Sequence, residues 1–175
     1  SEIERLLERL KKALEEIKRS SERLIRKLEE VLRDLEREVR KLLEDSRRTL
    51  ERIRKEDKSD EELKRELDEH KDRTRKAERR LEEKLKTLAE EIKEYTRRLE
   101  EDLKRLREEI RRANVPRDAV EELERLLKEI EKTIEESRRR LEELLERIER
   151  LIRKVIEELR RSNEELERVI REKSK

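Results

Sequence analysis

The chain has 175 residues, of which 54 are Lys or Arg and 52 are Asp or Glu, so that 61% of the side chains are charged while the net charge is only +2. This charged fraction is more than twice that of an average globular protein. Cys is absent, which excludes disulfides, thiolate nucleophiles and Cys-based zinc sites. Both signs of charge are interleaved and Tyr95 is the only aromatic residue. This composition argues against a nucleic-acid-binding stripe and against a membrane-bound helix.

Apolar residues recur along the chain with the spacing 4-3-4-3-4, so that five steps cover 18 residues and the period is 3.6. Three blocks carry this repeat, from Ile3 to Ile53, from Leu63 to Ala113 and from Leu123 to Ile170. A strict heptad period of 3.5 would make the helices supercoil to the left, whereas 3.6 is the period of a straight α-helix. The pattern predicts three amphipathic, nearly straight helices in place of the disorder that a highly charged composition often accompanies.

The first helix is predicted over residues 2–56. The apolar periodicity lapses near 57–59, where a loop is expected. Ser59, followed three residues later by Glu62, has the form of a capping box that opens a helix. The second helix is therefore predicted over residues 60–113.

The periodicity lapses a second time near 114–116, which predicts another short loop. Pro116 suits the first helical position or the residue before it, because its missing N–H is not needed there. Asp118 with Glu121 offers a second helix cap. The third helix is predicted over residues 117–172.

Loops of about three residues force sequential helices to lie antiparallel. The predicted fold class is therefore all-α: a long, antiparallel, nearly straight three-helix bundle with up-down-up topology and coiled-coil-like packing. We expect one domain over residues 1–175. Surface Glu–Lys and Glu–Arg pairs at i,i+4 contribute a few tenths of a kcal/mol each and mainly keep the bundle soluble.

Several positions of the apolar stripes hold hydroxyl, amide or imidazole groups. If the helices reverse at the two loops, facing residue numbers add to roughly 116 between the first and second helices and roughly 231 between the second and third. These sums place the polar residues of all three helices at two levels. The first level comprises Ser20, Ser21, Tyr95, Thr96, Thr133 and Ser137, and the second comprises Ser46, Thr49, His70, Thr74, Ser162 and Asn163. We interpret the levels as two buried hydrogen-bond networks that set helix register, because an axial slip would leave polar groups unpaired at about 1–3 kcal/mol each.

His70 is the only imidazole of the chain and the sharpest candidate for chemistry. It lacks a second His or a Cys as a companion, and the nearby acidic residues lie on other faces of its helix. We therefore predict a buried, neutral histidine with a structural hydrogen bond, and the alternative is a pH switch. Carboxylate pairs lie on a charged face and lack a desolvated cleft. We expect no catalytic residue, metal ligand or cofactor-binding residue, and no enzyme.

The first and third helices carry a second apolar line that most of the second helix lacks. In a closed monomer these lines would pack where the first and third helices meet. Alternatively, they would form a groove for a fourth helix or a symmetric partner. The residues are Leu6, Ala13, Leu24, Val31 and Leu42 in the first helix, and Ala119, Leu126, Leu144, Leu151 and Val169 in the third.

The absence of Gly would occur by chance in 175 residues with a probability on the order of 10⁻⁶ at average Gly frequency. Four further features are unusual for a natural protein: the triplicated 18-residue repeat, the Glu/Lys/Arg surface, the Leu/Ile/Val core and a set of clustered polar residues. The clustered polar residues are Ser20, Ser21, Ser46, His70, Tyr95, Ser137 and Asn163. On these features, over the whole chain, the sequence resembles de novo designed helical bundles of the untwisted three-helix type with buried hydrogen-bond networks.

The resemblance implies a very stable structural scaffold without natural ligand, catalysis or cellular location. The longest apolar runs are two residues and no signal-peptide segment opens the chain, so we expect a soluble protein. The first residue is Ser1 in place of Met, from which we expect recombinant expression. We expect no nucleic acid, membrane or small molecule as a partner. The main expectation is a monomer, and the alternative is a homo-oligomer or a complex with a designed helical partner.

Overall fold

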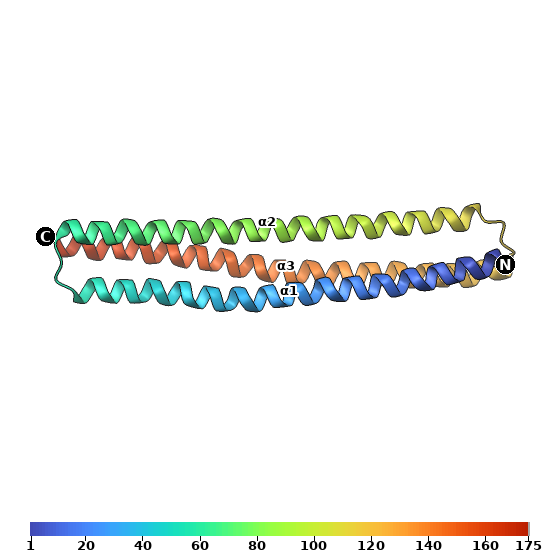
Figure 1. Cartoon of the computed structure of the whole chain (residues 1–175), viewed down its shortest axis with the longest axis horizontal. Helices are drawn as coiled ribbons and strands as arrows, with labels where there is room; N and C mark the ends of the chain where they lie inside the picture. Colours follow the sequence, from blue (N-terminus) through green and yellow to red (C-terminus); the bar gives the residue numbers. More distant parts are fainter. Residues whose placement is uncertain (175) are drawn as a thin grey trace. The chain divides into compact units, whose positions relative to one another are not determined.

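The computed structural model describes residues 1–174 and consists of three α-helices: α1 (Glu2–Lys55), α2 (Asp60–Arg112) and α3 (Arg117–Lys173) (Figure 1). They contain 54, 53 and 57 residues, and the described part of the chain has no strand. The helices pack against one another, so the predicted all-α three-helix bundle is confirmed. Each helix begins and ends within one residue of its predicted bounds. The nearly straight course and the single domain stay predictions.

The loop between α1 and α2 covers residues 56–59 and ends in a helix cap. The hydroxyl of Ser59 accepts a hydrogen bond from the backbone N–H of Glu62 at 3.3 Å, which is one half of the predicted capping box. Acidic residues fill the first turn of α2 and basic residues its last turn. This distribution of charge is favourable to the helix dipole.

The loop between α2 and α3 covers residues 113–116 and is capped differently from the prediction. The carbonyl of Pro116 accepts the N–H groups of Ala119 at 3.1 Å and Val120 at 3.2 Å. Asp118 is already the second residue of the helix, so the predicted cap at this residue is wrong. Pro116 supplies the cap because its fixed φ favours the start of a helix and its carbonyl is free to accept.

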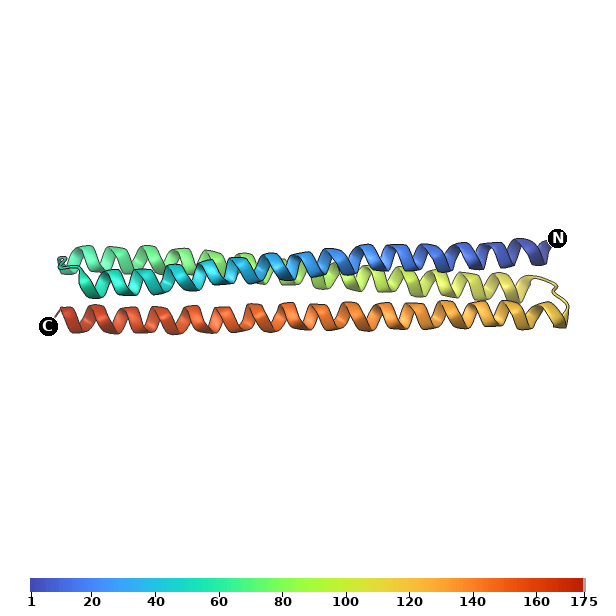
Figure 2. The ribbon, with the colours of Figure 1, turned by 90° about the horizontal axis from the view of Figure 1, so that it is seen from below.

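Contacts divide the chain into two compact units, and each draws on all three helices. Unit 1 comprises Ser1–Glu30 and Leu88–Leu145, and unit 2 comprises Val31–Thr87 and Glu146–Lys175. In unit 1, the start of α1 lies at the same end as the loop from α2 to α3 (Figure 2). In unit 2, the end of α3 lies beside the loop from α1 to α2, where the Nζ of Lys173 donates to the carbonyl of Glu56 at 2.8 Å.

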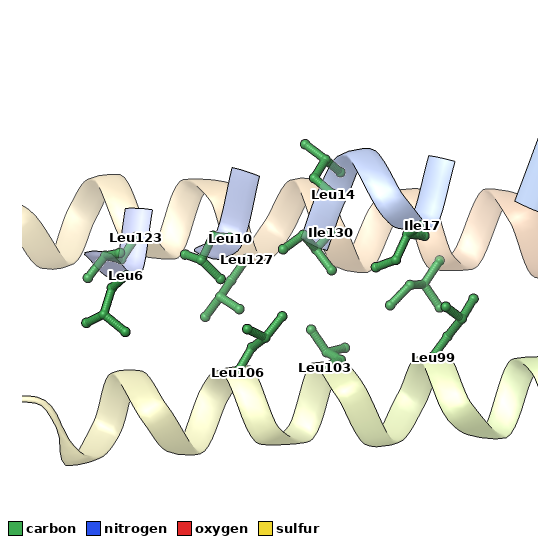
Figure 3. Packing of buried hydrophobic residues seen from close by; sticks show 11 residues of the cluster. Leu6, Leu10, Leu14, Ile17, Leu99, Leu103, Leu106, Leu123, Leu127 and Ile130 are labelled. Atoms are coloured by element: carbon green, nitrogen blue, oxygen red, sulfur yellow. The ribbon is translucent and has the colours of Figure 1, made fainter. Parts of the chain in front are cut away.

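Each unit has an aliphatic core to which all three helices contribute. In unit 1, leucines of α2 point toward leucines and isoleucines of α1 and α3 (Figure 3). Leu123 and Ile130 at the centre of this core are 0% exposed. Burying one such side chain contributes about 1.5–3 kcal/mol. The core of unit 2 includes Leu50, Ile53, Leu63, Leu166, Val169 and Ile170.

The predicted apolar stripes are all turned inward. Within residues 1–174, no large hydrophobic side chain is exposed. Of the second apolar lines, Leu6, Leu144 and Val169 are buried, and the other members are half-buried. The bundle therefore covers its own apolar surface.

We expect Ile130→Ala to lower the free energy of unfolding by about 2–5 kcal/mol, because the truncated side chain leaves a cavity among residues that cannot collapse into it. Guanidinium denaturation followed by circular dichroism measures this change. The matched control is Lys132→Ala, an exposed position on the same helix, with an expected change within about 0.5 kcal/mol. Equal effects of both substitutions would contradict the packing described for unit 1.

Candidate functional site

The polar pair of unit 1 joins α1 to α2. The hydroxyl oxygens of Ser20 and Tyr95 lie 2.6 Å apart. Because the Ser20 hydroxyl donates its only proton to the carbonyl of Ile17 at 3.2 Å, the Tyr95 hydroxyl is the donor of the shared bond. Burial raises the pKa of the Tyr95 hydroxyl above its ordinary value of 10.0, against the opposing effects of the Ser20 and Ser21 hydroxyls, which can donate to the phenolate form, and of the positive charges of Arg98 and Arg23. Tyr95 is therefore neutral at pH 7 and acts as a hydrogen-bond donor.

The other polar residues of the first predicted level bond within their own helices or not at all. The hydroxyl of Ser21 donates to the carbonyl of Lys18 at 3.1 Å. Thr96 donates to the carbonyl of Ile92 at 2.9 Å, and Thr133 donates to the carbonyl of Glu129 at 2.8 Å. Ser137 is buried, and in the described part of the chain it has no hydrogen bond to another helix. The structure thus brings together Ser20 and Tyr95, with the Ser21 hydroxyl close enough to act on the Tyr95 pKa, and leaves the α3 residues of this level apart from them.

His70 of α2 is 1% exposed and lies between two hydrogen-bonding partners in unit 2. Its Nδ1 is 3.3 Å from Nη2 of Arg73, and its Nε2 is 3.3 Å from Oγ of Ser46. A guanidinium can only donate, so Nδ1 accepts from Arg73. The imidazole is therefore neutral, with its proton on Nε2, from which it donates to Ser46 of α1.

Three surrounding features act on the pKa of His70. Burial lowers it below the ordinary value of 6.5, and the positive charges of Arg73 and Arg52 lower it further. The carboxylate of Asp45 acts in the opposite direction, and one of its oxygens lies 4.0 Å from Nε of Arg73. A second proton on the ring would sit on Nδ1, where it would face the donor of Arg73. Burial and geometry therefore both favour the neutral ring.

A second pair in unit 2 joins α2 to α3. The amide nitrogen of Asn163 donates to Oγ1 of Thr74 at 2.9 Å, and Thr74 in turn donates to the carbonyl of Lys71 at 3.0 Å. Oδ1 of Asn163 is buried and has no hydrogen-bond partner in the described structure. Thr49 donates to its own helix, to the carbonyl of Asp45 at 2.9 Å. Ser162 is half-buried and, among residues 1–174, makes no bond to another helix.

The contacting pairs show the register of the helices. The residue numbers of Ser20–Tyr95 and Ser46–His70 add to 115 and 116, close to the expected sum between α1 and α2. Between α2 and α3, the numbers of Thr74 and Asn163 add to 237, higher than the expected sum. The ion pairs Arg107–Glu131 and Lys71–Glu167 of the same two helices both add to 238. The expected sum of roughly 231 between α2 and α3 is therefore wrong by about six, and α3 lies at a different register along α2 from the one that a reversal at residues 114–116 predicts.

The Ser46–His70 pair is not arranged for catalysis. A serine nucleophile needs a histidine nitrogen that accepts its proton, and a carboxylate that accepts from the other ring nitrogen. In His70, Nε2 donates its proton to Ser46 and Nδ1 accepts a hydrogen bond from the Arg73 cation. Both hydrogen bonds run in the direction opposite to that in a catalytic triad. Ser46 is 3% exposed, and neither residue lines either of the grooves described below. Within residues 1–174, no group of three or more His, Cys, Asp or Glu side chains is placed to hold a metal ion.

A groove with a volume of about 1010 Å³ lies between α1 and α2 in unit 1. Ala13 and Leu24 of the second apolar line of α1 border this groove. The expectation that the second lines meet between the first and third helices is therefore wrong for Ala13 and Leu24. It holds for Leu151 of α3, which lies with Leu32 of α1 in a groove of about 280 Å³ in unit 2. The apolar pattern does not predict the larger groove, and the only signal for it in the sequence is the small size of Ala13 and Ser20 on α1.

None of the three helices, over the residues that the structure describes, is long and apolar enough to cross a membrane. Comparison of the chain with protein-family models, curated proteins and solved structures finds no match. Any function must therefore be argued from the geometry of the bundle itself.

The free energy of unfolding is expected to fall as the pH is lowered from about 7.5 to about 5. The unfolded His70 takes up a proton near its ordinary pKa of 6.5, whereas the folded one has a lower pKa. The stabilisation is therefore complete above about pH 6.5 and is lost progressively below it. Denaturant unfolding at several pH values measures this loss.

The control for this experiment is His70→Asn, which keeps every carboxylate of the chain. Carboxylates titrate near pH 4, so the difference in stability between the two proteins isolates the histidine above about pH 5. We expect the stability of the variant to depend less on pH in this range. The same pH dependence in both proteins would contradict the buried neutral imidazole.

Proposed function

We propose that the chain is a structural scaffold, a self-contained three-helix bundle without catalytic activity or a cofactor of its own. One observation carries this proposal: in the described residues, no large hydrophobic side chain remains exposed. A protein that depends on a partner to cover its core normally shows an apolar patch where the partner binds. Because no family model matches the chain, the proposal rests on the geometry of the bundle. The resemblance of the sequence to designed helical bundles is compatible with a scaffold.

The inter-helix polar pairs support a role in fixing register. Ser46–His70 ties α1 to α2, and Thr74–Asn163 ties α2 to α3, both inside unit 2. Sliding one helix past its neighbour would separate the donors from their acceptors in an apolar environment, at about 1–3 kcal/mol for each unpaired group. The aliphatic residues around them tolerate such a shift better, because leucine contacts have no direction. We infer that the polar pairs select one register among several that the leucines allow.

The alternative function, self-assembly or partner binding through the wider apolar faces of α1 and α3, receives less support. Leu144 is 3% exposed and Val169 is 7% exposed within the single chain. These side chains already have their contacts and would gain little from a second chain. A self-contained scaffold therefore explains the burial of these residues of the second apolar lines without a second chain, whereas assembly does not.

We expect small-angle scattering on an absolute scale to give the mass of one chain, 21.8 kDa, at every concentration. Leu144→Ala should lower the free energy of unfolding by about 2–5 kcal/mol and leave this mass unchanged, because the residue packs inside its own chain. Half-buried Leu151→Ala serves as the comparison, with a smaller expected loss. A mass that is a multiple of one chain, and that Leu144→Ala reduces, would instead establish the assembly.

Replacing a polar pair by aliphatic residues is expected to broaden the helix register without unfolding the bundle. The variant is Ser46→Ala with His70→Leu, and the control is Leu35→Ile with Leu81→Ile, an α1–α2 pair of 0% exposed leucines in the same unit. Spin labels on cysteines introduced at the exposed positions 47 and 69 report the distance between α1 and α2, since the chain has no other cysteine. We expect a single narrow distance distribution in the parent and the control, and a broader one in the polar-pair variant. Identical distributions in all three would refute the register role.

A further inference from the structure

The α1–α2 groove of unit 1 has the dimensions of a helix-binding site. It runs from Arg9 to Lys27 on α1, which is five turns or about 27 Å of helix. Its floor is apolar and is built by Ala13, Ile17 and Leu24 of α1 with Leu99 and Leu106 of α2. Two of the α1 residues that line the groove, Ala13 and Ser20, have small side chains. The hydroxyl pair Ser20–Tyr95 lies among the residues that line it.

The rim of this groove is positively charged. Two ion pairs span it near its ends, Arg9–Glu109 at 2.9 Å and Lys27–Glu91 at 2.8 Å. Seven basic and four acidic residues line the groove, an excess of three positive charges, whereas the whole chain has a net charge of +2. The lining residues are Arg9, Lys12, Arg19, Arg23, Lys27, Arg98 and Arg105 against Glu16, Glu91, Asp102 and Glu109, together with the apolar and hydroxyl residues of the floor.

Three of the basic side chains that line the groove make no ion pair within 4.0 Å among the described residues: Lys12, Arg23 and Arg98. Arg98 does act electrostatically on the carboxyl of Glu94 in its own helix. Arg23 of α1 and Arg98 of α2 both act electrostatically on the Tyr95 hydroxyl. Both also line the groove, one from each of its two helices. Two guanidinium groups above an apolar floor are suited to acidic side chains, which they can bind in a bidentate manner.

We propose that the α1–α2 groove docks one amphipathic helix of about five turns from an acidic partner protein. The apolar face of that helix lies on the leucines of the floor, and its flanking Glu or Asp side chains pair with Lys12, Arg23 and Arg98. Charge complementarity identifies this occupant, and the open groove admits a helix laid lengthwise. Leu99 and Leu106 are only 6% and 9% exposed, so charge contributes much of the selectivity. This inference does not depend on the register role of the polar pairs in unit 2.

A synthetic helical peptide of 18 residues tests the proposal, with leucines at i, i+3, i+4 and i+7 spacing, glutamates beside them, and no aromatic residue. Tyr95 is the only aromatic residue of the chain, so its emission reports occupancy of the groove without a label. Fluorescence anisotropy of the same peptide carrying fluorescein gives the dissociation constant. We expect both signals to saturate together, with weaker binding at higher salt.

Two variants locate the binding. Arg23→Glu with Arg98→Glu should weaken it about tenfold or more, because attraction becomes repulsion. The matched control is Arg75→Glu with Arg79→Glu, two exposed arginines of α2 in unit 2, which should bind like the parent. Ala13→Leu fills the hollow and should also abolish binding while the helix content stays the same. Its control is Ala89→Leu, a half-buried alanine of α2 outside the groove lining.

Four results would overturn the proposal. One is no saturable change in anisotropy up to millimolar peptide. Another is equal binding of a peptide with lysines in place of the glutamates. A rise in anisotropy with unchanged Tyr95 emission would place the peptide elsewhere on the protein. Finally, a dimeric mass in the absence of peptide, abolished by Ala13→Leu, would make a second copy of the chain the occupant.

Discussion

The structure depends on the burial of three apolar stripes that no single helix can bury alone. With 61% of its residues charged, each helix is polar around most of its circumference, and helix propensity alone supplies little stability in water. The stripes have the period of the α-helix, so each keeps one face toward its neighbours over all of its turns. The inward-facing leucines follow from that requirement, and the short loops at residues 56–59 and 113–116 make the helices antiparallel.

This requirement explains which parts of the structure the sequence predicts. The period and its two lapses define the helices to within one residue, because an apolar stripe cannot continue through a loop. The prediction fails at Asp118, where Pro116 supplies the cap, and at the α2–α3 level, where the helices meet at a register about six higher in the sum than a reversal at the loop predicts. It also misses the α1–α2 groove, since a stripe shows that Leu24 is partly buried but not which neighbour it faces.

The hydrogen-bond partners of the polar residues were harder to predict than their burial, because the partner depends on how far each side chain reaches from its own helix. A serine or threonine in a helix can donate to a carbonyl of its own preceding turn, as Thr49, Thr96 and Thr133 do. Tyr95 and His70 carry their polar atoms far from the backbone and have to reach another helix. The inter-helix bonds of the two predicted levels therefore form around the long or planar side chains, and the short hydroxyls are satisfied locally.

The polar pairs of the two units differ in what their surroundings permit. Ser46 and His70 lie on the central stripe and are buried; with Arg73 donating to the ring, the pair can neither accept a proton readily nor meet a substrate. Ser20 lies toward the edge of the α1 stripe, and its bond to Tyr95 borders an open groove flanked by unpaired cations. The same pairing of a hydroxyl with a ring is thus enclosed in unit 2, where we propose that it fixes the helix register, and borders an open groove in unit 1, where we propose that another helix binds.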